Sequence, residues 1–163
     1  MNTPTFQPLI DVTASPMGSA DCARFIQEAA TQVAALLTPL RCAGAAYTIG
    51  IRLDTDAEVQ ALNAQFRQKD KPTNVLSFPT DDADAWDEDD EVMYLGDIII
   101  ADGVLAREAA EKGLPVAQHL QHLVVHGILH IYGYDHIVDT EAEMMENTEI
   151  RILNNLGIEN PYE

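Results

Sequence analysis

Three histidines near the C-terminal end of the chain, His126, His130 and His136, have the spacing of a metal site. Residues four apart in an α-helix lie on the same face about one turn from each other, so His126 and His130 would point in the same direction. His136 follows Gly133, a residue that can end a helix and let the chain turn back. Three imidazoles brought together in this way can bind one metal ion, as in many hydrolytic zinc sites.

Two further histidines, His119 and His122, extend the same helical stripe toward the N-terminus. His122 and His130 are eight residues apart, which is about 12 Å along a helix axis. Both cannot therefore lie about 2.0–2.1 Å from one zinc ion. We expect His122, and Asp135 from the turn, to support the ligands rather than to join them. The alternative is a stripe of histidines that only faces solvent or a polar pocket, and it leaves the glycines and the third histidine without a reason.

The spacing also indicates whether such a metal acts in chemistry or in folding. Structural zinc sites are usually closed by four Cys or His ligands, whereas three ligands leave a position for water. The two cysteines, Cys22 and Cys42, are far from the histidines in the sequence, so we expect an open, hydrolytic site and two packing cysteines. Zinc peptidases of the His-Glu-x-x-His type have their general base where this chain has Gly127, which disfavours proteolysis. Zinc is the expected ion, and nickel or another divalent metal also suits three imidazoles.

Length and composition favour one cytoplasmic domain over residues 1–163. Hydrophobic residues make up 47% of the chain, but no apolar run approaches about 18 residues, and the N-terminus lacks the basic start of a secretory signal. We therefore expect no membrane association. The net charge of −18 argues against binding nucleic acid by bulk attraction. Eight of the 27 acidic residues lie in 81–91, a stretch that we expect to be a solvated loop.

The pattern of apolar residues predicts an α+β fold with about four strands in a mixed sheet and four or five helices. Strands are predicted over residues 8–12, 46–53, 74–79 and 94–100. Helices are predicted over residues 19–37, 55–66, 102–112, 115–132 and 140–156, and the fourth of these holds the metal motif. Two helices begin with the sequence of a capping box, Thr55 to Glu58 and Thr140 to Glu143.

Four parts of the chain carry a family resemblance: His126-Gly127-x-Leu129-His130-x-x-Gly133-Tyr134-Asp135-His136, Asn63 with Phe66-Arg67, Lys69 through Pro79, and Leu95-Gly96-Asp97-Ile98. On these residues the chain resembles the YbeY family of bacterial metal-dependent endoribonucleases, and the resemblance covers residues 45–155. One departure is Ile131-Tyr132, where the family more often has aliphatic residues, and we expect a packing change there.

The resemblance implies a small α+β fold, a zinc ion on His126, His130 and His136, and cleavage of single-stranded RNA. It further implies a role in maturing the 3′ end of small-subunit ribosomal RNA and in ribosome quality control, so the small ribosomal subunit is the expected partner. The family's important arginine corresponds to Arg67.

Phosphate chemistry fits the residue types. A metal on three neutral imidazoles keeps its positive charge and can lower the pKa of a water ligand. We therefore expect His126, as a metal ligand, and Arg67, as a phosphate contact, to be the catalytic residues. Arg67 can bind phosphate oxygens through its fork of N–H groups, and Lys69 and Lys71 can add point charges. Asp97 is expected to be structural. Two alternatives stay open: a ribosome-associated factor whose metal is mainly structural, and a metal-dependent hydrolase of another substrate.

Overall fold

The structure is a computed structural model that describes residues 5–15, 18–37, 39, 46–69, 73–80, 92–133 and 139–159, without the side chains of 139–142. Within these ranges the chain forms five strands and five helices. The strands are β1 (Thr5–Phe6), β2 (Leu9–Val12), β3 (Ala46–Asp54), β4 (Val75–Pro79) and β5 (Met93–Ala101). The helices are α1 (Ser19–Leu36), α2 (Asp56–Arg67), α4 (Asp102–Lys112), α5 (Val116–Tyr132) and α6 (Asp139–Asn155). The predicted α+β class is confirmed, and the predicted acidic loop over 81–91 lies outside the described residues.

The start of α2 shows how the sequence sets an element boundary. Thr55 is the N-cap, and its side chain accepts a hydrogen bond from the Glu58 backbone N–H at 3.2 Å. The expected capping box is thus half correct, because the Thr55 backbone N–H donates to the Asp54 carboxylate at 2.7 Å. A carboxylate at the end of β3 therefore does what the third helical residue does in the usual box.

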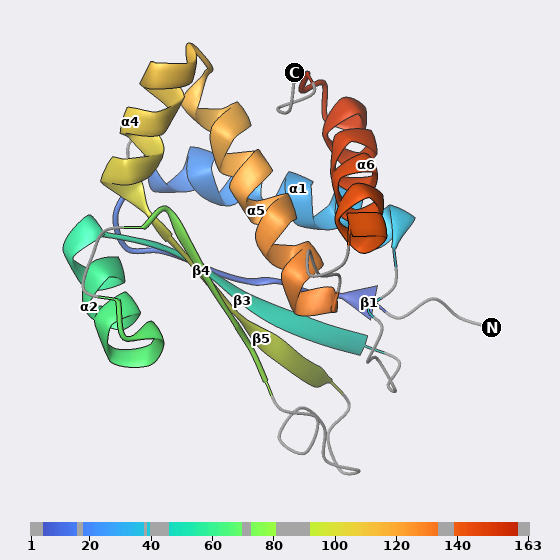
Figure 1. Cartoon of the computed structure of the whole chain (residues 1–163), viewed down its shortest axis with the longest axis horizontal. Helices are drawn as coiled ribbons and strands as arrows, with labels where there is room; N and C mark the ends of the chain where they lie inside the picture. The colour runs from blue at the N-terminus through green and yellow to red at the C-terminus, as the bar shows by residue number, and fades with distance from the viewer. Residues whose placement is uncertain are drawn as a thin grey trace.

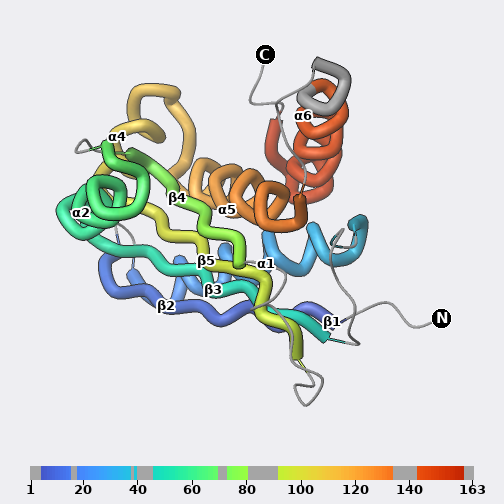
Figure 2. The backbone as a smooth tube through the Cα atoms, turned by 60° about the horizontal axis from the view of Figure 1, so that its bottom comes forward, coloured from blue at the N-terminus to red at the C-terminus, as the bar shows by residue number. Residues whose placement is uncertain are grey.

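The five strands form one mixed sheet whose path runs β1-β3-β5-β4, with β2 also paired to β3. Strands β1, β2 and β5 are parallel to β3, and β4 is antiparallel to β5. Figure 2 shows these strands side by side, with β4 at one edge and β2 at the other. Strand β3 alternates between buried and half-exposed residues, so the two faces of the sheet have different surroundings.

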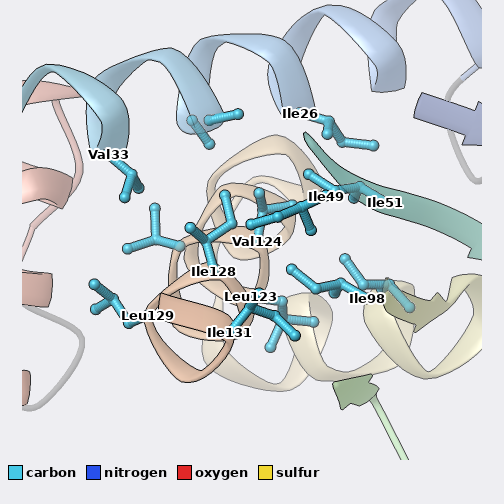
Figure 3. Packing of buried hydrophobic residues seen from close by; sticks show 14 of the residues in the cluster. Ile26, Val33, Ile49, Ile51, Ile98, Leu123, Val124, Ile128, Leu129 and Ile131 are labelled. Carbon is cyan, nitrogen blue, oxygen red and sulfur yellow. The ribbon is translucent and has the colours of Figure 1, made fainter. Parts of the chain in front are cut away.

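Helices α1, α5 and α6 pack on one face of this sheet, and α2 lies on the other side (Figure 1). The main core fills the space between the sheet and α5, where Ile49, Ile51 and Ile98 meet Val124 and Ile128 (Figure 3). A smaller cluster under α2 contains Val59, Leu76, Ile99 and Ala101. Helix α5 is thereby buried on nearly all sides, which holds its histidines in fixed positions.

Two glycines set the depth and the end of α5. A Cβ on Gly127 would come within 3.0 Å of Ile98, so a residue without a side chain lets the helix lie close to β5. Gly133 caps the helix with φ of 106°, a conformation that L residues rarely adopt, and its N–H bonds to the carbonyls of His130 and Leu129. The predicted helix end at this glycine is confirmed.

Tyr132, the residue that departs from the family pattern, is fully buried. Its hydroxyl forms a hydrogen bond with that of Tyr47 on β3, whose ring stacks on Phe6. The expected packing change is therefore also a polar contact between the end of α5 and the sheet. Cys22 is a buried free cysteine, as expected, whereas Cys42 lies outside the described residues. Among the described residues, no helix is long and apolar enough to cross a membrane.

Candidate metal centre

His126 and His130 lie one turn apart on the same side of α5, where their rings meet. Their Nε2 atoms are 3.1 Å apart, and their ring centroids are 4.7 Å apart. Two nitrogens that each lie about 2.0–2.1 Å from a tetrahedral zinc ion would be about 3.3 Å from each other. The two rings therefore already have nearly the spacing of a chelating pair.

Glu149 on α6 holds the outer nitrogen of His126. Its Oε1 atom is 2.7 Å from His126 Nδ1, and the residue is fully buried. An ionised carboxylate can only accept, so Nδ1 carries the proton and the Nε2 lone pair faces His130. Carboxylates fix metal-binding histidines in this tautomer in many zinc sites. Charge and orientation at this pair thus suit a divalent cation.

Sequence reasoning missed Glu149, although a signal was present. Met145, Glu149 and Ile152 lie on one face of α6 at helical spacing, and all three are buried. An acidic residue in the apolar stripe of a helix requires a buried partner. Only the packing of α6 on α5 shows that this partner is His126.

His122 lies one turn before His126 and beside the same carboxylate. Its Nε2 is 3.7 Å from Glu149 Oε1, and its ring packs edge-on against that of His126. Burial lowers the pKa of His122 from 6.5 to about 4, although the charge of Glu149 acts in the opposite direction. His122 is therefore neutral at pH 7 and adds no positive charge next to His126 and His130, which are called the metal pair below.

His119 has a separate set of partners. Its Nε2 lies 2.9 Å from Glu108 on α4, and Glu108 also accepts a hydrogen bond from Asn74 at the start of β4. Burial raises the pKa of Glu108, but the hydrogen bonds from His119 and Asn74 outweigh it, so the pKa is lowered overall. This network ties α4, α5 and β4 together at the far end of the histidine stripe.

The structure thus brings two of the three expected ligands, His126 and His130, close together. The third, His136, lies outside the described residues, as does Asp135. No group of three or more His, Cys, Asp or Glu side chains in the described part of the chain is arranged to hold an ion by itself. The fit to a metal rests on the spacing of the two Nε2 atoms and on the tautomer that Glu149 imposes.

Arg67 ends α2 at the outer edge of β4. Its guanidinium donates to the carbonyl of Ser77 and lies 5.5 Å from the centre of the Phe78 ring. Strand β4 packs against α5, so Arg67 is one strand away from the helix of the metal pair. Lys69 follows in the exposed turn after the helix, where its N–H bonds to the Asn63 carbonyl. Lys71 lies outside the described residues.

The lowered pKa of His122 predicts acid sensitivity of the metal-free protein. Between pH 6.5 and 4 the unfolded chain binds a proton at His122 that the folded chain does not, so the free energy of unfolding falls as the pH falls. We expect this residue to account for a loss on the order of 2–3 kcal/mol at pH 4 relative to pH 7. Urea unfolding of wild type and His122→Gln at both pH values measures it, and an equal loss in the two proteins would contradict the prediction.

Comparison with known proteins agrees with this fold. A family model described as endoribonuclease YbeY matches residues 16–157. A protein named endoribonuclease YbeY from Rhizorhabdus wittichii is 58% identical over 118 residues, which is 70% of each chain. Another of that name, from Sphingopyxis alaskensis, is 51% identical over 118 residues with the same coverage. The solution structure of TM1509 from Thermotoga maritima has a similar fold, with a TM-score of 0.61 and 24% identity over 92% of this chain and 89% of that one.

The chain belongs to the YbeY family of endoribonucleases, a family of RNA-cleaving enzymes. The resemblance drawn from its motifs is thereby confirmed. Family membership favours the expected endoribonuclease over the two alternatives, a ribosome-associated factor with a structural metal and a hydrolase of another substrate.

Proposed function

We propose that the chain is a zinc-dependent endoribonuclease that cleaves single-stranded RNA and acts in the cytoplasm on the 3′ end of small-subunit ribosomal RNA, in maturation and quality control. The observation that carries the metal dependence is the 3.1 Å separation of the His126 and His130 Nε2 atoms, with Glu149 bound to the back of His126. His136, whose place in the sequence lets it return to this pair, is the third ligand in this proposal.

Each residue near the site has a distinct task in RNA cleavage. A zinc ion held here would supply positive charge at the scissile phosphate and lower the pKa of a nearby water molecule. Glu149 keeps the proton on His126 Nδ1, so that Nε2 stays available as a ligand. Arg67 has five N–H groups, of which one bonds to Ser77 within the described residues, and the others can bind a phosphate oxygen. Gly127 leaves the first ligand without an adjacent carboxylate base.

The charge of the chain restricts where RNA can bind. With a net charge of −18, most of the surface repels phosphate, so affinity must come from a few local cations. Arg67 and Lys69 stand together at the end of α2, and Lys71 follows two residues later in the sequence. We place the RNA backbone along this edge of β4, with the metal pair at one end of its path.

Metal removal tests the proposal directly. A chelator should stop cleavage of single-stranded ribosomal RNA, and added zinc should restore it, because the ligands must hold an ion for the reaction. A substrate with one 2′-deoxy nucleotide at the cut site separates two nucleophiles, since continued cutting excludes the RNA 2′-hydroxyl and leaves water. The His126→Ala protein, purified in parallel, controls for contaminating nuclease. Cleavage that resists the chelator would contradict the metal dependence.

A further inference from the structure

A groove of about 640 Å³ lies on the face of the sheet opposite α5, between β2, β3, β5 and α2. Its floor is a row of residues that pair across four strands: Leu9, Gly50, Asp97 and Phe78. Leu62 and Phe66 of α2 form one wall. Phe66, Phe78 and Asp97 belong to the stretches that carry the family resemblance. The metal pair lies on α5, on the other face of the sheet, and does not account for the groove.

The end of the groove nearest Arg67 is aromatic. The side chain of Phe66 is 58% exposed, and its ring meets that of Phe78 edge-on with centroids 5.6 Å apart. The Arg67 guanidinium also lies over the Phe78 ring, 5.5 Å from the ring centre. Exposed rings beside a cation are the pairing by which proteins bind single-stranded nucleic acid, with the base stacked on the ring and the phosphate on the cation.

The inner end of the groove offers a hydrogen-bond acceptor. The Asp97 carboxylate lies across Gly50, where a Cβ would overlap its Oδ1 atom. Tyr94 forms a hydrogen bond with this carboxylate, and burial together with that bond raises the pKa of Tyr94, so the phenol stays protonated as a donor. Gly50 thus makes room for the Asp97 carboxylate, which is held by the Tyr94 hydroxyl and lines the groove.

The two ends of the groove differ in charge. Arg67 lies beside Phe78 at the rim, whereas the carboxylates of Asp11 and Asp97 line the interior. Arg52 also lines the interior, but its guanidinium is paired with the Asp54 carboxylate at 3.2 Å. A phosphate is attracted to the rim and repelled from the interior. The interior instead suits a flat ring that brings N–H donors, which is the chemistry of a nucleobase edge.

We infer that this groove is a nucleobase subsite for the single-stranded RNA substrate, in which a base stacks on Phe66 and its N–H edge meets Asp97 while Arg67 binds the adjoining phosphate. The inference rests on the proposed RNA substrate and adds a second contact region to it. Guanine is the preferred base, because its edge carries two N–H donors side by side for one carboxylate, whereas uracil carries one.

Binding of guanosine 5′-monophosphate to the full-length protein, loaded with zinc and followed by methyl NMR, tests the subsite. The Leu62 and Ile99 signals line the groove and should shift, while that of Ile131 on the α5 side should not. Ribose 5-phosphate and uridine 5′-monophosphate are the matched probes, and both should shift the groove signals less. Equal effects of ribose 5-phosphate and the guanosine nucleotide, or no shift in the groove, would overturn the inference.

Two variants separate stacking from edge recognition. Phe66→Ala should weaken binding of a short single-stranded RNA about tenfold, within the usual worth of one stacked base. Asp97→Asn should keep the stacking but abolish the preference for guanine over uracil. Met144→Ala is the matched control, because Met144 is 65% exposed on α6, away from the groove, and it should bind RNA as wild type does.

The failure of this inference can be told apart from the failure of the proposed function. If wild type cleaves RNA and Phe66→Ala binds RNA equally well, the subsite is wrong and the endoribonuclease proposal stands. If wild type does not cleave RNA in a zinc-dependent manner, the proposed function fails first. Groove signals that respond to a basic, apolar peptide but not to RNA would replace the nucleobase by a protein partner and overturn the inference.

Discussion

His126→Ala is expected to lose metal binding and RNA cleavage together. The substitution removes one of the two described nitrogens that face a common point and leaves the buried Glu149 without its closest imidazole. Loss of a partner behind a ligand already costs about 10–100-fold in metal affinity, so loss of the ligand itself should cost more than about 100-fold. Zinc content after dialysis and the cleavage rate of single-stranded RNA measure the two effects in the same preparation.

The control for this variant is His119→Gln, which changes a buried histidine two turns away on the same helix. His119 contacts Glu108 on α4 and is neither an expected ligand nor an expected support of one, so its variant should retain zinc at pH 7. Circular dichroism of the metal-free proteins shows whether either substitution unfolds the chain. A folded His126→Ala protein that keeps its zinc would exclude this pair as the metal site.

Arg67→Glu should retain zinc and lose RNA cleavage. Arg67 is exposed at the edge of β4, where its guanidinium contacts Ser77 and Phe78, so the fold should tolerate the change. Reversing a charge at a phosphate contact replaces attraction by repulsion and also removes the forked N–H donors. We expect a decrease of about 100-fold in kcat/KM, equivalent to about 2.7 kcal/mol in transition-state stabilisation.

Arg24→Glu is the matched control for net charge. Arg24 is also an exposed arginine, on α1, with an ion pair to Asp21 one turn away at 3.6 Å. Both variants change the net charge by the same amount, so a general electrostatic effect on RNA binding would appear in both. Arg67→Lys should fall between wild type and Arg67→Glu, because lysine keeps the charge without the fork. Equal cleavage by wild type and Arg67→Glu would refute the phosphate contact.

The order of elements and most of their ends follow from the sequence, because local chemistry sets them. Thr55 begins α2 and Gly133 ends α5 through contacts within one turn. The His126–His130 pair follows likewise from helical spacing alone. These features need no knowledge of what packs against them.

Features that depend on packing between distant segments could not be predicted. Glu149 reaches His126 across 23 residues, and only the docking of α6 on α5 joins them. The groove depends on the strand register, which brings Leu9, Gly50, Asp97 and Phe78 into one row from four separate strands. Asp97 was expected to be structural, and its place above Gly50 shows that the carboxylate also reaches an open surface.

The position of Glu149 in the last helix has a consequence for synthesis of the chain. His126 and His130 leave the ribosome before α6 does, so a nascent chain that ends before residue 139 has both imidazoles but lacks the carboxylate that orients one of them. Without that acceptor, the proton of His126 can occupy either ring nitrogen, and the imidazole of His126 no longer has a fixed orientation. The proposed metal centre therefore has its oriented His126 only after α6 has been translated and has docked on α5.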